Sequence, residues 1–216
     1  MVHALHAQPL FLGITQNLIF RYCRNRAETL TLQTVNRKWN INSKTKEKEK
    51  KTMKPTIVIY GSSTGTCQSI AETIASKLGV EAIEAGSLTA DVIASHDNLL
   101  LGTSTWGAGE LQDDWYDGIK TLKSAGLSGK TVALFGCGDS ESYPDTFCGG
   151  MKELYDAAKE AGANVLEGVS TDGYTFDESE AVVDGRFVGL ALDDVNEDDK
   201  TEERIDAWLE AIKPAL

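Results

Sequence analysis

TIVIYGSSTGTC, residues 56–67, begins with a short apolar run and continues into a loop of glycines and hydroxyl side chains. The apolar run Thr56–Tyr60 has the composition of a strand that is buried on both faces of a sheet. The segment that follows, Cys67–Leu78, carries apolar side chains at helical spacing. A loop that joins a strand to a helix in this way presents backbone N–H groups and hydroxyls at a helix N-terminus, where a phosphate group is stabilised.

The loop Gly61–Thr66 differs from two common phosphate-binding motifs. It lacks the Gly-Lys-Ser/Thr that ends the P-loop of nucleoside triphosphatases, and it lacks the G-x-G-x-x-G of dinucleotide folds. A monophosphate bound without a metal ion fits the loop better. The alternative is an ordinary strand-to-helix turn, in which serine and threonine only cap the helix.

Apolar runs and amphipathic segments alternate from Thr56 to the C-terminus. Besides the first strand, we expect four more, of which the last named is the weakest: Asn98–Gly102, Thr131–Cys137, Asn164–Val169 and Glu81–Glu84. Helices are expected at Cys67–Leu78, Asp113–Leu122, Gly149–Ala161 and Thr201–Ile212, the last after a capping box, Asp199-x-x-Glu202. This βαβα order predicts a parallel sheet with helices on both faces and ligands beyond the carboxyl ends of the strands.

The fifth strand unit is interrupted by additional chain. Ser170–Glu180 separates Val169 from Ala181–Val188, a segment that contains Asp184-Gly185 between two β-rich halves. Asp-Gly in that context is typical of a hairpin turn. We therefore expect an insertion of roughly 20 residues in this strand unit.

Two further loops at the predicted carboxyl edge combine glycines with a large aromatic side chain. Thr103–Leu111 follows the third strand and contains Trp106, and Gly136–Cys148 follows the fourth and contains Tyr143. Considered alone, Trp106 is equally well interpreted as a loop anchor packed in the core, and Tyr143 as a surface residue. Because the two loops are predicted to converge, we favour a site in which the two aromatic side chains sandwich one planar ring.

Together these motifs resemble those of the flavodoxins, and specifically the long-chain group, over essentially all of residues 53–216. The phosphate loop of that family is Ser/Thr-x-Thr-Gly-x-Thr, which Ser62–Cys67 matches except at its last position. Thr105-Trp106 followed by Gly-x-Gly-Glu-Leu resembles the family's inner flavin loop, and Gly138-Asp139 with Tyr143 and Phe147 resembles its outer loop.

The resemblance implies a flavodoxin-like, doubly wound α/β fold: a five-stranded parallel sheet of order 2-1-3-4-5 in three α/β/α layers, with a long-chain insertion in strand 5. It implies flavin mononucleotide (FMN) held without a covalent link, and no metal ion. The residues that it assigns to the FMN site are Ser62, Ser63, Thr64, Gly65, Thr66, Cys67, Thr105, Trp106, Gly107, Cys137, Gly138, Asp139, Tyr143, Phe147, Cys148 and Asp172.

Five of these residues have particular expected roles. Cys67 replaces the last threonine of the phosphate motif, but its backbone N–H is retained, so we expect the phosphate site to persist. Gly107 can adopt a positive φ angle at little steric cost, which lets its peptide carbonyl accept a hydrogen bond from the flavin N5–H. By the resemblance, Asp172 approaches the ribityl chain. Cys137 is interpreted, like Cys148, as packing beside the ring and not as a redox thiol, because no resolving partner is evident.

Charge divides the chain into two parts. Residues 1–52 hold ten Lys/Arg and three Asp/Glu, whereas residues 53–216 hold 11 Lys/Arg and 30 Asp/Glu. A body this acidic repels phosphate backbones and anionic membrane surfaces, and it attracts basic protein partners. The four cysteines form no C-x-x-C pair, which favours a reducing compartment, and no apolar run approaches the roughly 20 residues that span a bilayer.

The basic leader, residues 1–52, is interpreted as an upstream extension without a fold, either disordered or not part of the native protein. Met53 directly precedes Lys54-Pro55-Thr56 and the first strand, as a natural start would. A targeting peptide is the alternative, because apolar stretches here alternate with arginines before the lysine-rich run Lys44–Lys51. The domain therefore begins at residue 53.

The function that the resemblance implies is that of a low-potential one-electron carrier, and not of an enzyme. Its expected partners are redox proteins with basic docking faces, namely flavodoxin or ferredoxin reductases and electron-accepting enzymes, and it is expected to be a cytoplasmic monomer that binds neither nucleic acid nor membrane. An FMN-dependent enzyme of the same fold, such as a quinone reductase, is the alternative. A phospho-receiver module fits less well, because Gly61–Thr66 offers hydroxyls where such modules cluster acidic residues.

Overall fold

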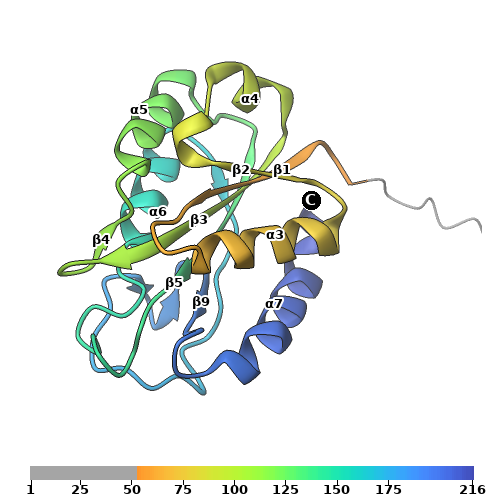
Figure 1. Ribbon diagram of the computed structural model, residues 1–216. Helices are drawn as coiled ribbons and strands as arrows, with labels where there is room; N and C mark the ends of the chain where they lie inside the picture. Colours follow the sequence, from red (N-terminus) through yellow and green to blue (C-terminus); the bar gives the residue numbers. More distant parts are fainter. Residues whose placement is uncertain (1–52) are drawn as a thin grey trace, which may run out of the picture. The chain divides into compact units, whose positions relative to one another are not determined.

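The computed structural model describes residues 53–216, which are coloured in Figure 1; the predicted leader, residues 1–52, lies outside the described residues. The strands are β1 (Thr56–Gly61), β2 (Glu81–Glu84), β3 (Asn98–Trp106), β4 (Glu110–Leu111), β5 (Thr131–Cys137), β6 (Asn164–Val165), β7 (Val182–Val183), β8 (Arg186–Phe187) and β9 (Leu190–Leu192). The helices are α3 (Thr66–Leu78), α4 (Ala90–Ser95), α5 (Trp115–Ala125), α6 (Met151–Glu160) and α7 (Asp198–Ile212), with 3-10 turns η1 (Ala85–Ser87) and η2 (Lys213–Ala215).

A parallel sheet of order β2-β1-β3-β5-β6 forms the centre of the fold. Counted as strand units, this is the predicted order 2-1-3-4-5, which is confirmed. The register places Ile57 of β1 beside Leu99 of β3, and Leu99 beside Val132 of β5. The carboxyl ends of these three strands therefore lie along one edge of the sheet.

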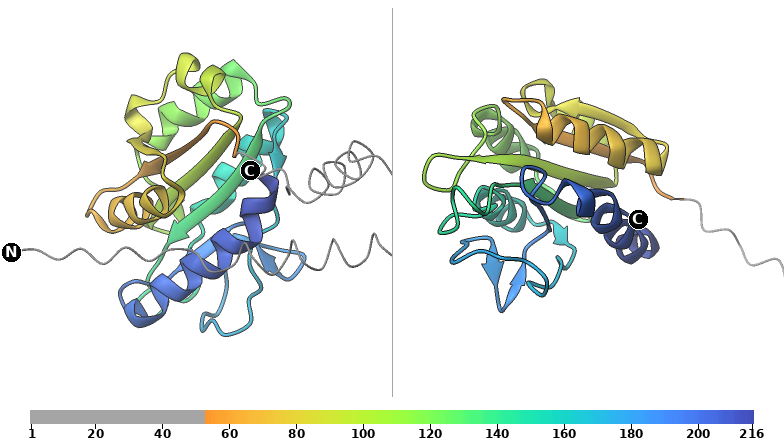
Figure 2. Two further views of the ribbon diagram at one scale, coloured as in Figure 1. Left: turned by 90° about the vertical axis from the view of Figure 1, so that its right-hand side faces the viewer. Right: turned by 60° about the horizontal axis from the view of Figure 1, so that its bottom comes forward.

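Each face of the sheet packs against its own layer of helices. Because side chains alternate along a strand, Ile57 and Ile59 of β1 belong to one core cluster, and Val58 and Tyr60 belong to the other. The first cluster includes buried residues of α4, α5 and α6, and the second includes those of α3 and α7. Figures 1 and 2 show this three-layer arrangement, with α3 and α7 together on one side of the sheet.

The fifth strand position is shared by two short segments. β6 pairs with the start of β5, and β9 pairs with its end, where Leu190 lies beside Phe135. The predicted buried strand Asn164–Val169 was therefore wrong beyond Val165, because the chain leaves the sheet there and only β9 completes the row. The predicted hairpin is confirmed: β7 and β8 are antiparallel, and Asp184 and Gly185 between them both have positive φ.

Three local predictions need correction. The capping box at Asp199 and Glu202 was wrong, since α7 begins at Asp198 and its cap residue, Glu197, makes no side-chain cap hydrogen bond. α5 begins at Trp115, two residues later than predicted. The sequence pattern also missed α4, whose six residues are too few to show a helical period.

Gly102 of β3 is where two strands leave no room for a side chain. A Cβ atom there would lie 2.1 Å from the ring of Phe135, which is fully buried and packs edge-on against Trp208 at 6.3 Å between ring centroids. The Gly102 carbonyl also accepts a hydrogen bond from Trp115 Nε1 at 2.8 Å. The Phe135 ring therefore requires a glycine at this position.

We expect Gly102→Ala to lower the free energy of unfolding by about 2–3 kcal/mol, because the added methyl overpacks a core that cannot yield. Gly86→Ala is the matched control, since its Cβ would meet only Asp114, at 3.7 Å. Urea unfolding of both variants measures the difference. Equal stability of the two variants would show that the Phe135 ring moves aside freely.

Candidate functional site

The three predicted loops meet at the carboxyl edge of the sheet and enclose a cavity of about 220 Å³. The side chains and backbone that line it come from the carboxyl ends of β3 and β5, from the start of α3 and from the loops after β1, β3 and β5, with one residue from the segment after β9. They are Thr64, Thr66, Ser104, Thr105, Trp106, Gly107, Cys137, Gly138, Asp139, Tyr143, Thr146, Phe147, Cys148 and Val195. Most of the predicted site residues are therefore brought together at one place.

The loop between β1 and α3 leaves a helix N-terminus open. The cap residue of α3 is Gly65, with φ +94°, and no side chain caps the helix. Its own N–H donates to Ser62 Oγ at 3.2 Å, and Ser63 and Thr64 are exposed. The N–H groups of the first helical turn have no intrahelical acceptor, so this end of α3 can receive an anion.

The side chain of Cys67 belongs to the core and does not line the cavity. It is 0 % exposed among the residues that join α3 to the sheet. Two effects raise the pKa of the Cys67 thiol well above its usual value: the larger is a hydrogen bond with the Cys137 thiol, and the second is burial. The predicted contribution of Cys67 to ligand binding is thus restricted to its backbone N–H.

The inner loop is a hairpin, where the sequence predicted only a loop after Gly102. β3 continues to Trp106 and pairs with β4, and the turn has Gly107 at φ +53° and a hydrogen bond from Gly109 N to Trp106 O of 3.0 Å. Trp106 is 43 % exposed, and its Nε1 donates to Ser104 Oγ at 2.9 Å. Of the two interpretations of Trp106, the core anchor is therefore excluded.

The outer loop after β5 presents Tyr143, which is 60 % exposed, on the same cavity. Phe147 and Cys148 also line the cavity, and both side chains are buried. The Cys148 thiol lies 3.6 Å from Gly136 O and 3.7 Å from Leu192 O, and burial raises its pKa well above the usual value. Cys148 is therefore a packing residue and not a reactive thiol.

The structure also changes the membership of the site. Asp172 does not line the cavity: it is exposed, and its carboxylate accepts from Ser170 Oγ at 2.7 Å within its own turn. Ser104, Thr146 and Val195 line the cavity without having been predicted. Thr146 and Ser104 lie inside the predicted loops, but nothing in the sequence pattern marks Val195, which enters only because β9 returns to the sheet.

Comparison with known proteins agrees with this geometry. A family model described as Flavodoxin matches residues 58–208. The chain belongs to the flavodoxin family. Flavodoxin 1 of Azotobacter vinelandii is 42 % identical over 163 residues, which cover 72 % of this chain and 94 % of that protein. Flavodoxin 1 of Escherichia coli is 36 % identical over 163 residues, covering 74 % and 93 %. The crystal structure of Fusobacterium nucleatum flavodoxin bound to FMN has a TM-score of 0.71 at 32 % identity, covering 76 % of this chain and 99 % of that one.

Within this flavodoxin the insertion holds the outer loop from the side. Pro144 O accepts hydrogen bonds from Asp177 N at 2.9 Å and Glu178 N at 3.0 Å, and Ser179 Oγ donates to Phe147 O. A second hollow, of about 470 Å³, lies between the inner loop, the outer loop and the insertion. Its lining includes four carboxylates, those of Asp145, Asp177, Glu178 and Glu180.

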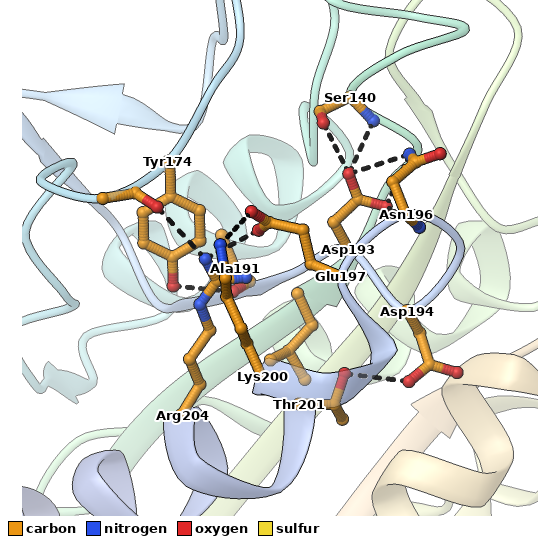
Figure 3. Close-up of polar contacts among 12 residues, drawn as sticks. Ser140, Tyr174, Ala191, Asp193, Asp194, Asn196, Glu197, Lys200, Thr201 and Arg204 are labelled. Carbon is orange, nitrogen blue, oxygen red and sulfur yellow. Dashed lines mark hydrogen bonds and ion pairs between the residues drawn. The ribbon is translucent and has the colours of Figure 1, made fainter.

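The insertion is joined to α7 through Tyr174 (Figure 3). The Tyr174 hydroxyl donates to Ala191 O at 2.9 Å, and the Arg204 guanidinium lies 4.1 Å above the centre of the ring. Arg204 pairs with Glu197 at 2.7 Å and donates to Gly173 O at 3.3 Å. Burial raises the pKa of Tyr174 to about 12, with Arg204 opposing the shift.

The described residues contain neither a metal-binding cluster nor a membrane-spanning helix. Within residues 53–216, no group of three or more His, Cys, Asp or Glu side chains is arranged to hold a metal ion. No helix in that same range is long and apolar enough to cross a membrane.

The raised pKa of Tyr174 predicts a loss of stability at high pH. Between the unfolded pKa near 10 and the folded pKa of about 12, the folded chain retains a proton that the unfolded chain releases, so the free energy of unfolding falls as the pH rises through this window. We expect Tyr174→Phe to make the fall shallower. Urea unfolding at pH 9, 10 and 11 measures it, and a slope unchanged in the variant would contradict the assignment. Tyr116→Phe, an exposed tyrosine, is the control.

Proposed function

We propose that this chain binds FMN without a covalent link and carries single electrons between redox proteins at low potential. The observation that carries the proposal is the pairing of Trp106 and Tyr143, two exposed aromatic side chains on different loops that line one cavity with Thr64 and Thr66. An FMN-bound flavodoxin of known structure has the same fold. The functional unit is residues 53–216.

The residues of the cavity fit the two ends of FMN. A phosphomonoester suits the uncapped N-terminus of α3, where Ser62, Ser63, Thr64 and Thr66 supply hydroxyls and the backbone supplies N–H donors. No lysine or metal ion is needed there. A planar ring suits the space between Trp106 and Tyr143, and each aromatic contact of this kind adds about 1 kcal/mol beyond apolar burial.

The chain's own residues favour a low potential. FMN, when bound, supplies one-electron chemistry. The electron-rich faces of Trp106 and Tyr143 disfavour added negative charge between them, and nearby carboxylates act in the same direction. Asp139, which lines the cavity, remains ionised, because hydrogen bonds from the Asn196 amide and the Ser142 N–H lower its pKa.

Partner recognition is proposed to use the acidic side of the same edge. The hollow that contains Asp145, Asp177, Glu178 and Glu180 adjoins the cavity, since Thr146 lines both. Because residues 53–216 hold 30 Asp/Glu against 11 Lys/Arg, partners with basic docking faces, such as flavodoxin or ferredoxin reductases, are attracted and nucleic acids are repelled. We propose that the chain acts as a monomer in the cytoplasm.

An FMN-dependent reductase of quinones is the alternative function. Such an enzyme needs a general acid or base beside the ring, and the only histidine within residues 53–216 is His96. His96 follows α4 and precedes β3, and its Nδ1 lies 2.8 Å from Val92 O. It therefore lies at the amino end of the sheet, opposite the cavity.

The test is a reductive titration of the whole chain. The protein, loaded with FMN, is titrated with dithionite under nitrogen while the visible spectrum is recorded. A long-wavelength absorption band that rises to half reduction and then disappears is the expected result, because it reports two separated one-electron steps. Reduction in a single two-electron step would favour the enzyme, and a protein that ignores added FMN would overturn the flavin assignment.

Gly107 provides a second test. Its φ of +53° lies in a region that β-branched residues rarely adopt. If its peptide is free to turn, the Gly107 carbonyl can accept a hydrogen bond from the N5–H of bound FMN. That hydrogen bond would favour uptake of the first electron over uptake of the second. We expect Gly107→Val to narrow the gap between the two one-electron potentials, as measured by redox titration.

The matched control for this test is Ala108→Val in the same turn, because Ala108 does not have a positive φ. We expect the control to leave the gap unchanged. A gap that is equally wide in Gly107→Val and in the unaltered chain would refute a role for this peptide.

A further inference from the structure

A buried carboxylate lies directly beneath the outer flavin loop. Asp193 follows β9 and is 1 % exposed. Its Oδ2 accepts hydrogen bonds from both the N–H (3.0 Å) and the hydroxyl of Ser140, which is the second residue after Gly138 in the outer loop. Figure 3 shows the carboxylate of Asp193 pointing at Ser140.

Asn196 extends this contact to a second point of the loop. Its side-chain amide donates to both oxygens of Asp193, at 2.9 and 3.0 Å, and to Asp139 Oδ1 at 3.0 Å. Asp139 in turn accepts from Ser142 N at its carboxylate (2.9 Å) and from Tyr143 N at its carbonyl (3.0 Å). A continuous series of hydrogen bonds therefore connects Asp193 to the backbone of Tyr143.

The hydrogen bonds of Asp193 come from uncharged donors. Within residues 53–216, no cation forms an ion pair with Asp193, so its charge is satisfied by neutral N–H and O–H donors alone. A buried carboxylate is costly unless its donors stay in place, which is why removing any of them is strongly disfavoured. The outer loop is thus held by a group that tolerates little displacement of Ser140.

We propose that Asp193 is a positioning residue for the FMN site: its carboxylate fixes Ser140 and, through Asn196, Asp139, and so holds Tyr143 over the cavity. The inference rests on the proposed function for the part that concerns FMN. Asp193 does not line the cavity and acts only through the loop. Hydrogen bonds from the insertion hold the outer loop at Pro144 and Phe147, and the hydrogen bonds of Asp193 hold it at Ser140.

The main variant is Asp193→Asn, which keeps the shape of the side chain but turns an NH₂ donor toward groups that need an acceptor. Its matched control is Asp194→Asn, the neighbouring carboxylate, whose Oδ1 accepts a hydrogen bond from Thr201 Oγ1 at 2.8 Å, outside the outer loop. Asn196→Ala is the milder variant in case Asp193→Asn does not fold, because it leaves Ser140 bonded to Asp193.

The first measurement is amide hydrogen exchange of Ser140, Ser142 and Tyr143 in the whole chain without FMN. We expect exchange about tenfold faster or more in Asp193→Asn, a smaller change in the same direction in Asn196→Ala, and no change in Asp194→Asn. Exchange that stays at the level of the unaltered chain in both Asp193→Asn and Asn196→Ala would overturn the proposal. This result does not depend on whether FMN binds.

The second measurement is the dissociation constant of FMN from quenching of flavin fluorescence. We expect Asp193→Asn to weaken binding about tenfold when Tyr143 is present and to have much less effect in a Tyr143→Ala background, because the loss acts through that side chain. An equal loss in both backgrounds would show that Asp193 stabilises the fold generally, and would overturn the positioning role. If the unaltered chain itself binds no FMN, the proposed function fails. The amide exchange rates then remain the test of whether Asp193 holds the outer loop.

Discussion

Burial of β1, β3 and β5 on both faces is the constraint on which the rest of the molecule depends. Strands covered on both sides must find helices above and below, and the βαβ connections that supply those helices make the strands parallel. Parallel strands in turn end at a common edge. The three loops that form the cavity are adjacent for this reason, although a helix separates each from the next along the chain.

The close packing of this sheet also explains its glycines. Gly102 leaves room for the ring of Phe135, and Gly136 leaves room for Met151, whose side chain would lie 2.4 Å from an added Cβ. Both positions come just before a strand reaches the cavity edge. The absence of a Cβ at these two positions therefore lets the large side chains of Phe135 and Met151 pack against the paired strands β3 and β5 next to the cavity edge.

The departure of Cys67 from the family's phosphate motif has a structural explanation. Its side chain faces the core beside Cys137, where a small apolar group packs well, and the backbone N–H remains at the helix N-terminus. The phosphate group that we propose for this loop would depend on the uncapped end of α3 more than on one hydroxyl. The replacement thus changes the core beneath the site while leaving the main anion-binding element in place.

In the amino-acid sequence, apolar periodicity predicted the parallel α/β class, and the family resemblance implied the strand order that the structure has. Glycine-rich loops with an aromatic residue are local signals, and they were enough to predict that Trp106 and Tyr143 lie at one edge of the sheet, where both line the cavity. The sequence did not predict which side chains of a motif line the cavity: Cys67 faces the core, and Asp172 remains in its own turn.

The three-dimensional structure was needed to show that β9 completes the fifth strand position and places Asp193 beneath Ser140, 53 residues away. Val195 enters the cavity for the same reason. The physical reason is that no periodicity records a contact formed when an insertion leaves a sheet and returns. Such contacts depend on where the chain packs and not on its local conformation.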